Sequence, residues 1–196
     1  MTRRTILSIG AFVLTAAALW WLLFVMVPRW YRGDPPPSAA AGSTAGGEGA
    51  QRKITATLFY ISEDGMSLVP VQREVAFAEP AVEQARQIVE AQIARPGPPL
   101  ASAIPEGTRL RAIFLSERGD AFVDLSGEVT ARHTGGALDE LFTVYAIVNS
   151  LTVTLPAITR VQILIDGKEV DTLAGHVDLR NPLSKNLTWV TSDKPS

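Results

Sequence analysis

The chain is 196 residues long, has no cysteine, and carries 18 basic and 20 acidic residues, which gives a net charge of −2 at pH 7. The absence of cysteine excludes a disulfide framework and any thiolate metal site. The basic residues are scattered along the sequence, whereas nucleic acid binding requires a concentrated positive surface. We therefore expect no nucleic acid partner.

Residues 5–27 form an uncharged apolar segment with two arginines on each side. As a helix this segment would extend roughly 35 Å, slightly more than the ~30 Å hydrocarbon core of a bilayer. It is predicted to be a transmembrane helix, with residues 1–4 in the cytoplasm and the rest of the chain outside it. A cleaved signal peptide followed by secretion is the alternative, although its apolar region normally covers about 7–15 residues.

The next segment, residues 28–50, is rich in proline, glycine and alanine. It has too little apolar surface to fold, so it is predicted to be a flexible linker with a stiffer start at prolines 35–37. Residues 51–183 are predicted to form one folded domain, which is large enough to bury a core without covalent staples. Residues 184–196 are predicted to be a C-terminal tail.

A hairpin and a helix are expected at the start of this domain. Residues 54–61 are β-branched and aromatic, and residues 68–75 return after a turn, so the two segments predict paired strands. Pro70 lacks the N–H that a strand ladder needs, so the second strand is expected at an edge or a bulge. A helix is expected to begin at Pro80 and to end before the proline-rich stretch at 96–99.

Two strands, at 109–115 and 121–125, precede a second helix that begins after Gly135-Gly136 and ends near Pro156. This helix is apolar on two sides, and such a helix needs two partners. A sheet is expected to cover one side, and a neighbouring copy of the domain could cover the other. Phe142, Ala146 and Asn149 are predicted to lie on that exposed side.

Residues 158–165 predict a further strand, and Asp166-Gly167 is a strong hairpin signal with residues 168–173 as the return. The order of elements is therefore β-β-α-β-β-α-β-β. This order indicates an α+β domain in which two helices pack on a mainly antiparallel sheet, preceded by the transmembrane helix.

Five stretches between residues 54 and 183 carry a family resemblance: LFYISEDGMSLVPVQREV, ASAIPEGTRLRA, AFVDLSGE, LFTVYAIVNSLT and ITRVQILIDGKEVDTLAGHVDL. In this order they resemble the GerMN domain family of sporulation and spore germination proteins. The resemblance implies an extracytoplasmic, often membrane-tethered domain, related to folds that build rings. It also implies work in the cell envelope rather than a known reaction.

Candidate catalytic and metal-binding groups are few. Ser126 lies between carboxylates, but no strand-turn-helix elbow surrounds it, and a nucleophile needs a base within reach. His133, His176 and Asp178 could supply metal ligands, although a sequence with two histidines offers few ligands for a metal site. We predict no enzyme activity, no metal and no cofactor. A hydrolase that uses His176 with a carboxylate is the enzymatic alternative.

Three further residues are candidates for interaction. Ser102 and Ile104 belong to a long loop at 96–107, where binding often occurs. His176 follows Gly175, and the pair is expected to be structural, with a glycine for backbone conformation and a histidine that fixes the loop.

Together these features predict a membrane-tethered, non-enzymatic interaction or scaffold domain of the bacterial cell envelope, which self-associates or binds a protein partner. The alternative is a module that binds peptidoglycan or another glycan for an envelope enzyme. A sugar site would need exposed aromatic side chains, and most aromatic residues of this sequence look internal.

Overall fold

The computed structural model describes residues 52–191, and the chain divides into two units between Gly47 and Glu48. The predicted transmembrane segment at 5–27 and the linker at 28–50 lie outside the described residues. Within 52–191 no helix is both long enough and apolar enough to cross a bilayer. This range contains seven strands and three helices.

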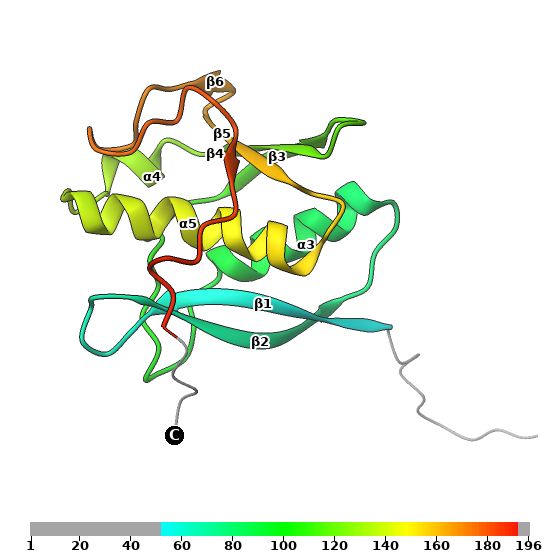
Figure 1. The fold of residues 1–196 in the computed structure, drawn as a ribbon, viewed down its shortest axis with the longest axis horizontal. Helices are drawn as coiled ribbons and strands as arrows, with labels where there is room; N and C mark the ends of the chain where they lie inside the picture. Colours follow the sequence, from blue (N-terminus) through cyan, green and yellow to red (C-terminus); the bar gives the residue numbers. More distant parts are fainter. Residues whose placement is uncertain (1–51, 192–196) are drawn as a thin grey trace, which may run out of the picture. The chain divides into compact units, whose positions relative to one another are not determined.

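The first layer is a two-stranded antiparallel sheet, drawn at the bottom of Figure 1. It consists of β1 (Lys53–Ile61) and β2 (Leu68–Ala76), which pair along their whole length. Pro70 lies within β2 opposite Phe59. Because β2 has only β1 beside it in this sheet, the predicted edge position of the proline-containing strand is confirmed.

The second sheet has five strands. They are β3 (Leu110–Leu115), β4 (Asp120–Leu125), β5 (Arg160–Ile165), β6 (Lys168–Glu169) and β7 (Leu183–Ser184). β3 forms one edge, β4 and β5 lie at the centre, and β6 and β7 both pair with β5. β4 and β5 run parallel because the chain crosses over through a helix between them, while all other pairs are antiparallel.

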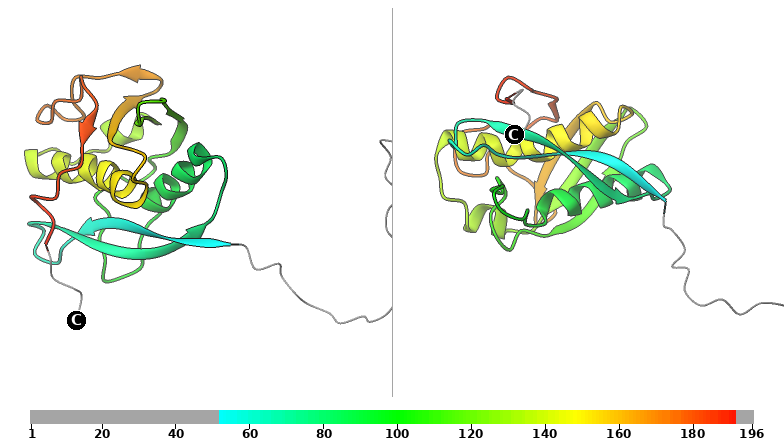
Figure 2. Two further views of the ribbon diagram at one scale, coloured as in Figure 1. Left: turned by 45° about the vertical axis from the view of Figure 1, so that its right-hand side comes forward. Right: turned by 90° about the horizontal axis from the view of Figure 1, so that it is seen from below.

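The two longer helices lie between the sheets, as Figures 1 and 2 show. α3 (Ala81–Ile93) begins one residue after the predicted Pro80, and α5 (Ala137–Thr154) is the crossover helix. A short third helix, α4 (Glu128–Ala131), follows β4. The α+β class and the mainly antiparallel pairing are confirmed. The expectation of two helices on one sheet is wrong, because the strands form two sheets and a third helix is present.

α5 is covered on both sides by its own chain. Val144, Ile147 and Leu151 belong to the main core under the five-stranded sheet. Phe142 and Ala146 join a second cluster with Phe59 of the hairpin. The second partner of this helix is therefore the β1–β2 hairpin and not a neighbouring copy. This satisfies the requirement that a helix with apolar residues on two sides be covered on both.

The predicted exposure of Phe142, Ala146 and Asn149 is accordingly wrong, since each side chain is completely buried. Asn149 binds the C-terminal segment instead. Its side-chain amide donates to the carbonyl of Asn186 at 2.7 Å and accepts from the N–H of Asn186 at 3.0 Å. These three residues hold α5 in place and are not available to a partner in this structure.

Polar side chains join the hairpin to the helices. Gln92 of α3 accepts a hydrogen bond from the Phe59 N–H at 2.8 Å and donates to the Phe59 carbonyl at 2.8 Å. The Ser150 hydroxyl of α5 donates to the same Gln92 oxygen at 2.7 Å. These bonds satisfy backbone groups of β1 that have no strand beside them, and they fix where the hairpin lies on the helices.

Candidate functional site

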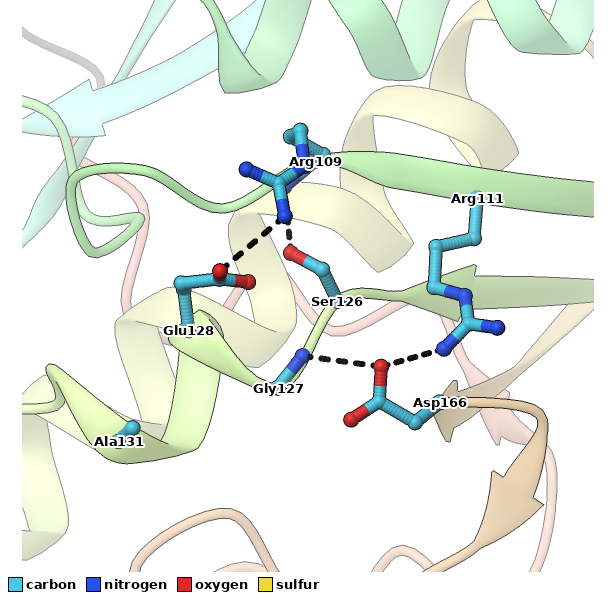
Figure 3. Close-up of a pocket in the computed structure, with 7 residues that line it drawn as sticks. All are labelled: Arg109, Arg111, Ser126, Gly127, Glu128, Ala131 and Asp166. Atoms are coloured by element: carbon cyan, nitrogen blue, oxygen red, sulfur yellow. Dashed lines mark hydrogen bonds and ion pairs between the residues drawn. The ribbon is translucent and has the colours of Figure 1, made fainter.

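A cleft of about 490 Å³ lies where the parallel strands β4 and β5 end, as Figure 3 shows. Leu125 and Ile165, the last residues of these strands, lie opposite each other. In open α/β sheets, ligands bind beyond the carboxyl ends of parallel strands. The cleft is lined by Arg109, Arg111, Ser126, Gly127, Glu128, Ala131 and Asp166, all but one of which come from the stretches that resemble GerMN domains.

Asp166, which lines this cleft, is held in place by backbone contacts. Its φ is +50°, in the left-handed region that aspartate tolerates better than most residues, and its N–H donates to the Leu125 carbonyl at 2.9 Å. Its carboxylate accepts the N–H of Gly127 at 3.3 Å. A Cβ on Gly127 would lie 2.7 Å from that carboxylate, so a side chain at this position would require the carboxylate to move.

Arg111 joins two carboxylates from different strands. Its guanidinium forms an ion pair with Asp166 through Nη1 and another with Asp124 through Nε, at 3.5 Å. Asp124 also accepts the N–H of Gly167 at 2.7 Å. β3, β4 and the turn after β5 are therefore tied together by one arginine, which fixes the floor of the cleft.

A second charge pair, Arg109 and Glu128, lies at the rim of the cleft. Arg109 donates from Nη2 to Glu128 at 3.1 Å, and its backbone exchanges hydrogen bonds with Ser126. The Ser126 hydroxyl, the N–H of Glu128 itself and the Arg109 guanidinium all favour the ionised carboxylate, so the pKa of Glu128 lies below its usual value. The Glu128 carboxylate is therefore ionised near neutral pH.

The charged groups of the cleft are paired with one another or with backbone N–H groups, and the Ser126 hydroxyl also hydrogen-bonds to the Glu128 carboxylate. The Ser126 hydroxyl accepts the N–H of Arg109 at 3.0 Å, and no histidine lines the cleft. Each carboxylate already has a guanidinium or backbone N–H as its partner. The cleft can offer fixed cations and anions to a ligand that carries both signs of charge.

His176 lies elsewhere, where it closes a loop onto α5. Its N–H donates to Glu140 at 2.8 Å, and its Nδ1 lies 3.1 Å from the same carboxylate. Gly175 has a φ of +99°, so the predicted structural role of this glycine and histidine is confirmed. The strand predicted at 168–173 is only two residues long because the chain turns away to reach Glu140.

Glu140 is the important residue that the sequence did not reveal. Its side chain is completely buried, and its other oxygen accepts the N–H of Leu173 at 2.8 Å. Burial acts to raise the pKa of Glu140, but hydrogen bonds from the backbone N–H groups of residues 173, 174, 176 and 177 outweigh burial and lower it. Its place beside Asp139 in a first helical turn gave no sign of this role.

The residues considered as metal ligands do not come together. Asp178 forms an ion pair with Arg180 at 2.7 Å, and this pairing lowers the pKa of Asp178 to about 2. His133 binds Thr143 at 3.2 Å and the N–H of Gly135 at 3.0 Å. Across residues 52–191 no group of three potential ligands is placed to hold a metal ion.

The loop candidates Ser102 and Ile104 line a smaller pocket of about 210 Å³ together with His133. Ser102 accepts the N–H of Ile104 at 3.1 Å, and Ile104 is almost completely buried. Thr143 of α5 donates to the carbonyl of Ala103 at 2.6 Å. The buried part of this loop contributes to both core clusters, with Ile104 in the main cluster and Ala103 in the second.

Comparisons with known proteins agree with this fold. Residues 57–171 match the family model Germane, described as sporulation and spore germination. No curated protein matches the chain. A Clostridium perfringens protein regarded as a lipoprotein has a TM-score of 0.49 and 25% identity, over 68% of this chain and 88% of that one.

Two structures of the Bacillus subtilis sporulation protein GerM are also similar. Its tandem GerMN domains give a TM-score of 0.55 at 19% identity, over 68% of this chain and 46% of that chain. Its first GerMN domain gives a TM-score of 0.49 at 20% identity, over 68% of this chain and 96% of that one. This chain therefore spans about half the length of the tandem protein. Since the family model matches more than half of its residues, the chain belongs to the Germane, or GerMN, family of sporulation and spore germination domains.

Proposed function

We propose that this protein is a membrane-tethered, non-enzymatic interaction domain that docks a protein partner on the outer side of the cytoplasmic membrane. The observation that carries the proposal is the cleft at the ends of β4 and β5. Its cations and anions are fixed by one another and by backbone groups, which suits recognition of a charged surface. The uncharged segment at 5–27 supports the tether, and the family match supports envelope work.

The proposal is tested in intact membranes with a photo-reactive side chain in place of Arg109. This residue lies on the rim of the cleft, with 70% of its side chain exposed. Lys53 on β1 is the matched control, because its side chain is 58% exposed and it does not line the cleft. We expect a discrete crosslinked adduct from position 109 and none from position 53. No adduct, or the same adducts from both positions, would refute docking at this cleft.

The position of the domain is tested separately by protease treatment of spheroplasts. A domain outside the cytoplasm is digested without lysis, and the exposed Lys185 gives trypsin a site near its C-terminal end. Protection of the domain until the membrane is broken would refute the extracytoplasmic placement. Because this experiment does not depend on a partner, it separates the tether from the docking site.

A second function, binding of peptidoglycan or another glycan, is favoured by one feature of the five-stranded sheet. Phe114 of β3 is 59% exposed and lies opposite Phe122 of β4. Exposed aromatic faces beside polar groups are suited to sugar rings. Co-sedimentation of the full chain with cell-wall sacculi, and its loss in Phe114→Ala, would support this function. A chain that stays in the supernatant would refute it.

A further inference from the structure

β3 is an edge strand with an unguarded apolar run. The five-stranded sheet ends at β3, whose only neighbour in the sheet is β4. Among the described residues, the backbone of 112–115 forms no hydrogen bond outside the β3–β4 ladder. Natural proteins protect such edges with charged residues, proline or a bulge. Here the bulge and Arg111 are confined to the start of the strand, and residues 112–115 read AIFL.

The side chain that stands out on this edge is Phe114. It belongs to neither core cluster, and the inward-facing residues of β3 and β4, such as Ile113 and Val123, are core members. Phe114 and Phe122 therefore face away from the helices, on the outer face of the sheet. A largely exposed aromatic residue on a free edge combines apolar surface with open backbone hydrogen-bonding groups.

We propose that β3 of one copy pairs antiparallel with β3 of a second copy, about a two-fold axis at Phe114. This inference deepens the proposed function, because it names a second copy of this chain as a partner and the β3 edge as the contact. In this register the two Phe114 side chains lie directly opposite each other. Aromatic pairs placed in this way stabilise antiparallel strands.

Charge complementarity selects this register. Arg111 lies at the bulge where β3 begins, and Glu117 lies in the turn just after β3, three positions on either side of Phe114. The two-fold axis therefore places Arg111 at the same end of the paired edge as the partner's Glu117. Arg111 uses Nη1 and Nε for the cleft carboxylates, which leaves Nη2 to donate. Glu117 is exposed and forms no ion pair with any residue in the described part of the chain.

The register shifted by one residue towards the start of β3 fits less well. A shift of the axis to Ile113 would place Phe114 opposite the partner's Ala112, which leaves most of the ring uncovered. The same shift would place Arg111 opposite the partner's Leu115. Directly opposite residues in an antiparallel pair lie on the same face of the sheet. An axis midway between two residues would place outward-facing Phe114 opposite an inward-facing residue, so such a register is excluded.

The natural absence of cysteine gives a direct test with the full-length chain in native membranes. We expect Phe114→Cys to form a disulfide-linked dimer at a rate at least about ten times that of Thr55→Cys. The reason is that pairing holds the two thiols at a high effective concentration. Thr55 is a matched control, since it is an exposed strand residue on β1, outside the five-stranded sheet. Equal rates for both variants would overturn the proposal, because random collision or contact elsewhere would then explain the dimer.

A second variant measures the assembly state without oxidation. Phe114→Lys places a charge on the free edge, and its exposure means that the fold should be kept, which circular dichroism checks. We expect the wild-type chain to sediment as a dimer in mild detergent and Phe114→Lys as a monomer. A variant with the same mass as the wild type would overturn the pairing. If the adduct at position 109 persists in that case, partner docking at the cleft survives while the second-copy contact does not.

Discussion

Removal of the Glu140 carboxylate should release the loop at 173–177 and lower the free energy of unfolding. The carboxylate accepts the N–H groups of Leu173 and His176, each at 2.8 Å, inside the protein. A hydrogen bond to a charged group contributes about 1.5–3 kcal/mol, and each buried N–H group left unpaired costs about 1–3 kcal/mol. We expect Glu140→Ala to cost about 3–5 kcal/mol, and Glu140→Gln, which keeps one acceptor oxygen, about half as much.

Urea unfolding followed by far-UV circular dichroism measures this cost. Asp139→Ala is the matched control, because Asp139 is the preceding acidic residue of the same helical turn. Asp139 is exposed, and within residues 52–191 its carboxylate accepts one hydrogen bond, from the Thr134 hydroxyl at 3.1 Å. Its loss should cost no more than about 1 kcal/mol, which is the usual effect of a carboxylate at a helix N-terminus. Equal costs for the two alanine variants would refute the argument that the loop contacts carry the effect.

The same residue makes a pH prediction. The pKa of Glu140 is lower in the folded state than its usual value of 4.5, so its contribution to stability is fully present above pH 4.5. That contribution is lost as the pH falls through the folded-state pKa. The difference in unfolding free energy between wild type and Glu140→Gln should therefore shrink below pH 4.5 and stay constant above it. A difference that grows as the pH falls would contradict this sign.

Three further predictions concern other contacts. Gln92→Leu should cost about 2–4 kcal/mol in urea unfolding, because it leaves the buried N–H and carbonyl of Phe59 unpaired; a loss below about 1 kcal/mol would contradict this. Gly127→Ala should cost about 1–3 kcal/mol through its clash at the cleft, whereas Gly97→Ala, with open space around it, should be nearly neutral. Asn149→Ala should speed tryptic cleavage at Lys185, because the segment at Asn186 loses its anchor; unchanged cleavage would show that other contacts hold it.

Local structure was predictable from the sequence where local chemistry decides it. The paired strands before Pro80, the hairpin signal at Asp166 and the extent of α5 all follow from side-chain pattern and turn residues. The two-sheet architecture was not predictable in this way. An apolar pattern shows how much of α5 must be covered, but it does not show whether the cover is a neighbouring copy or the hairpin from earlier in the same chain.

The cleft was hidden for a related reason. Arg111 and Asp166 are 55 positions apart, and they meet only because β4 and β5 run parallel and end side by side. Neither residue is unusual in its local sequence, since one lies near the start of a strand and the other belongs to a turn. Glu140 was hidden because exposed and buried carboxylates look the same in a first helical turn, and only the returning loop decides which one is buried.

The position of Arg111 connects the two contact surfaces inferred for this protein. The same guanidinium holds Asp166 and Asp124 in the cleft and stands at the start of the free β3 edge. A protein partner that drew Arg111 towards its own carboxylates would weaken the hold on the turn after β5. It would also remove the cation that faces Glu117 of the second copy across the paired β3 edges. Docking at the cleft and pairing of two copies should therefore oppose each other, and by linkage each should weaken the other by the same factor.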